Sequence, residues 1–213
     1  MATLLSVNIG RPAASRHTDT GITGIDKRPS PTPVELHDPG PGTGVSGVAG
    51  DAIGDPRNHG GTDQAVYAFA REELDHWQAE LGRPLTNGVF GENLTTAGLD
   101  VDGALVGERW QIGDACVLEV TSPRIPCRTF AGWLEEQLWV KRFTERGAPG
   151  AYLRVISPGA VHGGDAITVL HRPSHGVTIA LMFRALTTDK VLQPQLAAAG
   201  DALPEPLRRR LVS

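Results

Sequence analysis

"VTSPRIPCRTF" (residues 120–130) lies where a run typical of a β-strand ends and a run typical of a helix begins. Pro126 fixes its own backbone and restricts Ile125 to extended geometry, and Pro123 acts in the same way on the residue before it. The chain therefore reaches Cys127 with little conformational freedom. A rigid mount of this kind suits a metal ligand or a nucleophile.

The charges around Cys127 favour a reactive thiol. Arg124 and Arg128 would stabilise a thiolate, and the N–H groups of a helix that begins at Cys127 would act in the same direction, lowering the pKa from a free value of ~8.5. The alternative is a buried small apolar side chain, as most free cysteines are. We prefer this alternative for Cys116, which lies on a core-facing strand position.

The segments next to this stretch have clear periodicities. Residues 105–122 predict two strands joined at Gly113-Asp114, with Cys116, Leu118 and Val120 on one face. Residues 128–147 have apolar side chains at helical intervals. We expect one helix there, with Thr129 as its N-cap and Gly147 as its stop.

Further from this stretch the same two patterns recur. Residues 3–10 predict a strand and residues 71–82 a helix, whose buried face carries Leu74, Trp77 and Leu81. Two more strands are expected before Pro173. After Pro173 we expect three short helices, with caps at Thr178, Thr188 and Asp201.

The element order indicates a mainly β fold. About seven or eight short strands with two inserted helices, in a chain with 26 glycines and 16 prolines, favour a closed or nearly closed β-barrel. We therefore expect a barrel domain over residues 1–173 and a small extension of three helices over residues 174–213.

Composition excludes several classes of protein. Two cysteines are too few for a disulfide framework, and the N-terminus has no basic start followed by an apolar run, which predicts a cytoplasmic protein. No stretch approaches the ~20 apolar residues of a membrane span. A formal net charge of -4 gives no global attraction to nucleic acid, and we interpret the arginines at 208–210 as a solvated helix face.

A second candidate site is "GDAIGDPRNHGG" (50–61), where His59 precedes Gly60 and Gly61. Two glycines let backbone N–H groups approach an anion closely, although a turn before a strand also needs glycine. Neither zinc-site spacing nor a phosphate-binding loop occurs. A Cys-His-acid hydrolase stays formally open, with His59 as base and Glu92 or Asp55 as the group that orients it.

The ordered set "TGIDKRP", "HGG.DQAVYA", "FGENLTT" and "LEVTSPRIPC", together with the C-terminal helices, resembles the MOSC domain family and within it the bacterial YiiM type. The family is named for the C-terminal domain of molybdenum cofactor sulfurases. The resemblance runs over nearly the whole chain and implies a β-barrel-like fold. It also implies a molybdenum cofactor (Mo-molybdopterin) bound to Cys127, the cysteine of the "PRxPC" motif.

The same resemblance implies which residues line the cofactor pocket. They are Lys27, Arg28, His59, Gly60, Gly61, Gly91, Glu92, Asn93 and Arg124. Arg124 and Lys27 are our first candidates for the pterin phosphate. Two departures matter: Gln64 occupies a position that is often basic in relatives, and the Pro- and Gly-rich region 30–50 makes the placement of Lys27 less secure.

Two functions follow as hypotheses. In the first, the protein is a molybdenum-dependent oxidoreductase that reduces N-hydroxylated compounds such as hydroxylaminopurines, a detoxification, with Cys127, His59 and Glu92 as catalytic residues and electrons from an external reductase. In the second, Cys127 holds the cofactor or a persulfide sulfur in a carrier without redox turnover. The expected partners are a small N-hydroxylated substrate and the reductase, and a homodimer is compatible with the sequence.

Overall fold

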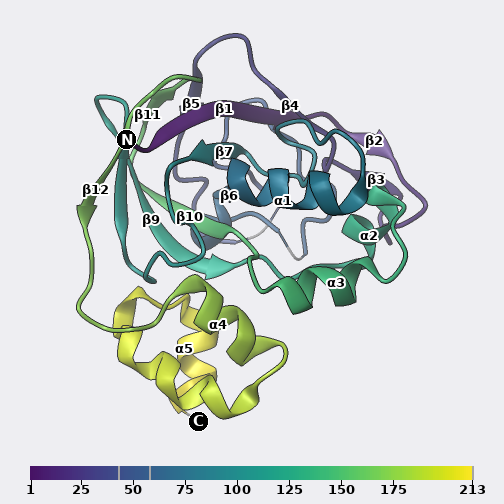
Figure 1. Ribbon diagram of the computed structural model, residues 1–213. Coiled ribbons are helices and arrows are strands. Elements are labelled where there is room, and N and C mark those ends of the chain that lie inside the picture. The colour runs from purple at the N-terminus through teal and green to yellow at the C-terminus, as the bar shows by residue number, and fades with distance from the viewer. Residues whose placement is uncertain (43, 58, 213) are drawn as a thin grey trace.

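Eight strands form one mixed sheet in the computed structural model (Figure 1), which describes residues 1–42, 44–57 and 59–212. Their order is β12-β8-β9-β10-β6-β7-β1-β4. The pairing of β6 with β7 is parallel, and the other neighbours are antiparallel. Two small two-stranded sheets, β11-β5 and β2-β3, lie outside the main sheet.

Helices are inserted between groups of strands, and three helical segments follow the last strand. The strands are β1 (Thr3–Gly10), β2 (Ala13–Ala14), β3 (Ile22–Thr23), β4 (Lys27–Pro29), β5 (Val34–Leu36), β6 (Val66–Ala70), β7 (Leu94–Ala97), β8 (Arg109–Ile112), β9 (Cys116–Pro123), β10 (Ala151–Ser157), β11 (Gly159–Val161) and β12 (Ile167–His171). The helices are η1 (Thr62–Gln64), α1 (Arg71–Leu81), α2 (Arg128–Leu134), α3 (Trp139–Arg146), α4 (Ile179–Leu186), η2 (Lys190–Ala202) and α5 (Glu205–Val212), where η marks a 3₁₀ segment.

The expected closed barrel is not confirmed. The sheet has two edges, β12 and β4. Within the described ranges, β1 contacts the start of β12 through one isolated bridge, Thr3 with Ala166, and a few backbone hydrogen bonds such as that from the Leu4 N–H to the carbonyl oxygen of Asp165, but no continuous ladder joins the two strands. The coarser prediction of a sheet-dominated fold with several inserted helices is confirmed.

Strand β9 carries the predicted core face. Cys116, Leu118 and Val120 are fully buried. The expected single helix over 128–147 is wrong, because α2 and α3 are separated by a turn in which Glu135 and Leu138 have positive φ angles of 56° and 55°. The Thr129 cap is wrong too, since Cys127 is the N-cap of α2, whereas Gly147 ends α3 as predicted.

The break has a geometric reason. Phe130 and Trp139 are nine residues apart, so one continuous helix at about 100° per residue would put their side chains on opposite faces. In the structure both are buried and their ring centroids are 5.3 Å apart. The turn at Glu135 and Leu138 lets both helices direct their aromatic side chains into the same cluster.

That aromatic cluster also receives α1. Leu74 and Trp77 are buried as predicted, Leu81 is half-buried, and Gly82 ends the helix in the left-handed region with φ 64°. Trp77 lies against Trp139, with ring centroids 4.6 Å apart. Helix α1 and the pair α2–α3 therefore share one core.

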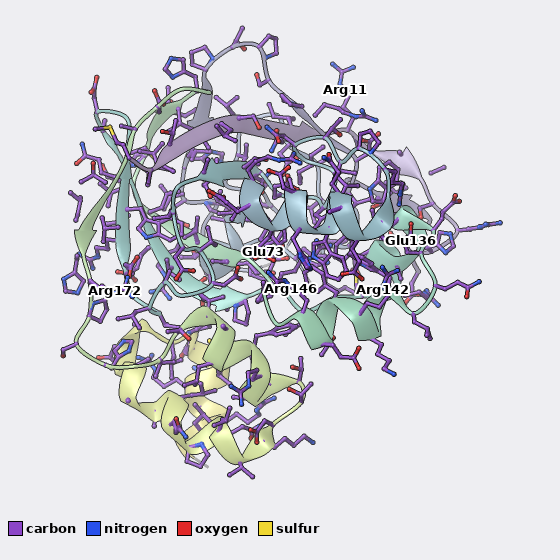
Figure 2. The ribbon with its side chains drawn as sticks, viewed as in Figure 1. Arg11, Glu73, Glu136, Arg142, Arg146 and Arg172 are labelled. Carbon is purple, nitrogen blue, oxygen red and sulfur yellow. The ribbon has the colours of Figure 1, made fainter. Side chains whose placement is uncertain are left out.

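Ion pairs at the surface tie α1 to α3. Arg146 contacts Glu73 at 2.7 Å, and Arg142 contacts both Glu80 at 2.7 Å and Glu136 at 3.6 Å. Figure 2 shows Glu73 beside Arg146 in the space between the two helices. Exposed pairs of this type contribute little stability each, so the aromatic core carries most of this packing.

The C-terminal helices follow the prediction only in part. Thr178 caps α4, its hydroxyl accepting a hydrogen bond from the Leu181 N–H at 3.0 Å. The middle segment is a 3₁₀ run preceded by Asp189, so the Thr188 cap is wrong. Pro194 inside this run lacks the N–H that an α-helix would use. Asp201 lies within the run and pairs with Arg208 instead of capping α5.

These helices pack on the sheet, below it in Figure 1. Ile179, Met182 and Leu196 belong to the same buried cluster as the core faces of β9 and β10, and Phe183 reaches the aromatic cluster. The domain boundary between 173 and 174 stays a prediction. Among the helices of the described ranges, none is long and apolar enough to cross a membrane.

Candidate functional site

Cys127 lies at the junction between β9 and α2. Its backbone is extended, with φ −130° and ψ 173°, and its N-cap position directs the free N–H groups of the first helical turn toward it. Cys127 is half-buried and free of any disulfide.

The surroundings of Cys127 favour the thiolate. Burial raises the pKa of the Cys127 thiol, but a hydrogen bond from His59, the positive charge of Arg124 and the backbone N–H of Phe130 outweigh it, and the pKa falls to about 6 from an ordinary value of 9.0. Burial raises the pKa of the other thiol, Cys116, to about 12. Cys127 is therefore ionised near neutral pH and Cys116 is not.

His59 joins Cys127 to a tyrosine. Nδ1 of His59 lies 3.3 Å from the hydroxyl oxygen of Tyr152, on β10. The two glycines after His59 have φ angles of 86° and 81°, and a Cβ on Gly60 would lie 2.5 Å from the carbonyl oxygen of Val45. Only glycine fits at that position, so the "HGG" motif fixes the place of the histidine.

Arg124 is a buried cation. Its guanidinium carbon lies 3.8 Å from the ring centroid of Phe130 and 5.3 Å from that of Tyr67, and its Nη1 donates to the carbonyl oxygen of Phe90. No carboxylate of the described residues pairs with it. A buried cation without an acidic partner is costly unless an anion neutralises it. Burial lowers the pKa of Arg124, but the opposing effects of Tyr67, Tyr152 and Cys127 raise it, so Cys127 is one such anion.

Lys27, unlike Arg124, is already paired. Its Nζ lies 2.5 Å from Asp51, which also accepts hydrogen bonds from the Gly10 N–H at 2.7 Å, from Ser46 at 2.9 Å and from Asn93 at 2.9 Å. Burial lowers the pKa of Lys27 against the opposing effect of Asp51. The lysine thus has less charge to offer a phosphate than Arg124.

Two connected cavities meet at Cys127. The inner one, about 690 Å³ and partly open to solvent, is lined by Lys27, Arg124, Gly60, Gly91 and Asn93 among others. The outer one, about 1120 Å³ including open solvent, is lined by residues 17–19 and by the turn that carries Cys127. The two share Thr18, Asp55, His59, Gln64, Cys127, Thr129 and Tyr152.

Most of the predicted site residues lie together at these cavities: Lys27, His59, Gly60, Gly91, Asn93, Arg124 and Cys127 line the inner one. Three do not reach either cavity. Arg28 is exposed and pairs with Asp26, and Gly61 packs on the backbone of Gly42. Glu92 is fully buried, and its carboxylate accepts hydrogen bonds from backbone N–H groups of its own loop.

Two side chains of the site, Tyr152 and Asp51, are not predicted from the sequence, and a third, Gln64, is predicted only in part. Tyr152 and Asp51 carry no local signal, because their partners are distant in sequence. Gln64 differs in the sequence only by its missing charge, and the structure adds a second feature. Its Oε1 is a buried acceptor without a hydrogen-bond donor among the described residues. An unpaired buried oxygen costs about 1–3 kcal/mol, which a ligand bound there would offset.

Comparisons with known proteins identify the family. The family model described as the MOSC domain matches residues 55–168. YflK of Bacillus subtilis, an uncharacterized protein, is 34% identical over 177 residues, covering 83% of this chain and 76% of its own. YiiM of Escherichia coli is 30% identical over 164 residues, covering 72% and 71%.

A third relative is longer. A protein named "Reductase" from Gibberella moniliformis is 32% identical over 133 residues, 61% of this chain, and the chain spans only 23% of that protein. Among solved structures, YiiM from Geobacillus stearothermophilus matches with a TM-score of 0.77 and 26% identity, over 100% of this chain and 98% of that one. The chain therefore belongs to the MOSC domain family and is a YiiM-type member of it.

Proposed function

We propose that this protein binds a molybdenum cofactor through Cys127 and reduces N-hydroxylated compounds to amines with electrons from a separate reductase. The observation that carries the proposal is the Cys127 thiolate, with its pKa of about 6, at the meeting point of the two cavities. A soft thiolate is a ligand suited to molybdenum in a sulfur-rich environment.

The residues present fit such a cofactor. Among the residues that the structure describes, the buried cation Arg124, which lines the inner cavity, has no acidic partner, and the buried side-chain oxygen of Gln64 has no donor. In the described part of the chain no group of three or more His, Cys, Asp or Glu could hold a metal ion. A metal at Cys127 would accordingly take its other ligands from an organic cofactor.

In this proposal Cys127 holds the metal, and Arg124 binds the anionic end of the cofactor. Asn93 and Lys27, both joined to Asp51, keep the wall of the inner cavity in place. When bound, the cofactor would supply two electrons for cleavage of the N–O bond. The chain itself binds, orients and provides protons.

The reaction consumes two electrons and two protons, and R–NHOH becomes R–NH₂ and water. The N–O bond breaks, and the oxygen leaves as water. His59 and Tyr152 form a hydrogen-bonded pair that lines both cavities beside Cys127. We assign to this pair the delivery of a proton to the leaving oxygen. The electrons come from a reductase protein, and the relative named "Reductase" contains a matching segment within a much longer chain.

The first experiment is the molybdenum content by elemental mass spectrometry of protein from a host that makes the cofactor. Cys127→Ser and a cofactor-deficient host serve as negative controls, and Cys116→Ala as the matched cysteine control. We expect stoichiometric metal in the wild type and in Cys116→Ala only. Folded wild-type protein without metal from the competent host would contradict the proposal.

A dye assay then separates catalysis from carriage. If this protein is the enzyme, the wild type loaded with cofactor oxidises a reduced artificial dye when a hydroxylamino compound is added. The Cys127→Ser variant does not. A carrier of cofactor or of persulfide sulfur would bind its cargo and show no oxidation that depends on substrate. That result would favour the carrier function over the reduction of N-hydroxylated compounds.

A further inference from the structure

The turn that carries Cys127 presents its side chains to two different cavities. Arg124 is 6% exposed and lines the inner cavity, whereas the next residue, Ile125, is 46% exposed and lines the outer one. Successive side chains of an extended chain point in opposite directions. Pro123 and Pro126 flank this pair and line the outer cavity as well.

Pro123, Ile125 and Pro126 form an apolar ledge in the outer cavity, next to Cys127. A single exposed isoleucine is ordinary on a protein surface, and Ile156 on β10 is 44% exposed without lining either cavity. Ile125 differs from Ile156 in two ways. It lies two residues from the thiolate, and the proline that follows it restricts its backbone.

The remainder of the outer cavity is largely polar. Tyr152 and His59, hydrogen-bonded to each other, line it, and so do Asp19 and Arg128, which pair with each other at 2.5 Å. A ligand in this cavity therefore meets apolar carbon on the ledge and hydrogen-bonding groups elsewhere. The polar end of such a ligand can form hydrogen bonds with His59 and Tyr152, which line both cavities beside Cys127.

We infer that the outer cavity is the substrate site and that Ile125 selects N-hydroxylated compounds carrying a flat, apolar ring over hydroxylamine itself. This inference rests on the proposed function. The inner cavity, with its buried cation, takes the cofactor. The ring of the substrate covers Ile125, and its N–OH group faces His59 and Tyr152. The reaction is unchanged: two electrons from the reductase and two protons convert R–NHOH to R–NH₂ and water.

The test compares N-phenylhydroxylamine with hydroxylamine on loaded enzyme in the dye assay. Ile125→Ser removes the apolar contact at an exposed position, so folding is preserved. Ile156→Ser is the matched control at equal exposure, and Ile125→Leu restores apolar area. We expect Ile125→Ser to lower kcat/KM for N-phenylhydroxylamine about fivefold, corresponding to ~1 kcal/mol, and to leave that for hydroxylamine unchanged. Ile156→Ser and Ile125→Leu should keep the wild-type ratio of kcat/KM for N-phenylhydroxylamine to kcat/KM for hydroxylamine.

Binding provides a readout that does not need turnover. Ligand-observed NMR on oxidised, loaded protein without reductant measures the dissociation constant of N-phenylhydroxylamine, which Ile125→Ser should weaken by the same factor. An equal loss for both substrates, or no loss, would overturn the inference while leaving the proposed function standing. Protein without molybdenum or dye oxidation would remove the proposed function. In that case the NMR titration still decides whether the ledge binds the aryl compound, and the absence of binding overturns the inference.

Discussion

His59→Ala should make the Cys127 thiol less acidic in protein that lacks cofactor. With a pKa of about 6, roughly nine tenths of this cysteine is thiolate at pH 7, whereas at the ordinary value of 9.0 about one hundredth would be. The hydrogen bond from His59 is the largest effect that opposes burial. Removing it leaves burial less opposed, so we expect the thiolate fraction at pH 7 to fall by about ten- to ninety-fold.

The assay is the rate of alkylation by iodoacetamide as a function of pH, on protein from a cofactor-deficient host. Cys116 is fully buried with a pKa of about 12, so it stays silent, and Cys116→Ala confirms this. The wild-type rate should reach half its maximum near pH 6, and the His59→Ala profile should shift to higher pH. A wild-type midpoint near pH 8.5, or profiles that coincide, would refute this account of the site.

Three further predictions concern stability. Burial raises the pKa of Asp102 to about 7, so its protonated form stabilises the fold at low pH, and this contribution is lost as the pH rises from about 4 through 7. Over that pH range, urea unfolding should show that the wild type loses ~2 kcal/mol more stability than Asp102→Asn, a value reduced from a ceiling of ~4 by partial exposure. Gln64→Met removes a buried acceptor that has no donor among the described residues and should raise the Tm of unliganded protein by about 2–4 °C, whereas Gln78→Met, which removes an acceptor in use, should lower it. Glu92→Ala removes the acceptor that holds its loop and should lower the free energy of unfolding by ~3 kcal/mol; a variant that loses activity at unchanged stability would instead support Glu92 as a proton donor.

The sequence was most informative where its signals are local. The prolines around Cys127 and the glycines after His59 determine the local backbone without help from distant residues. Cys127 and His59 both lie at the cavities, as predicted. The break between α2 and α3 was also predictable, since Phe130 and Trp139 are nine residues apart and could not share one face of a helix. The apolar residues of 128–147 recur at helical intervals over the whole segment, so the pattern predicts one helix although these two aromatic residues would lie on opposite faces of it.

The remaining features depend on contacts between distant segments. Tyr152 meets His59 across 93 positions, and Asp51 meets Lys27 across 24. No pattern in one sequence marks such pairs, because pairing follows from strand order and not from spacing. The closed barrel failed for the same reason: alternation predicts strands, but whether the first and last strands form a ladder depends on the shape of the whole sheet.

The aromatic cluster links the stability of the fold to the chemistry of the site. Phe130 packs against Trp139 and Phe143 and so joins α2 to α3, and its ring also lies 3.8 Å from the guanidinium of Arg124. Arg124 in turn favours the thiolate of Cys127. Loss of the Phe130 ring would therefore do two things at once: it would loosen the helix pair and remove the surface that holds the buried cation. The buried cation of the site therefore lies against the same aromatic side chains that form this core.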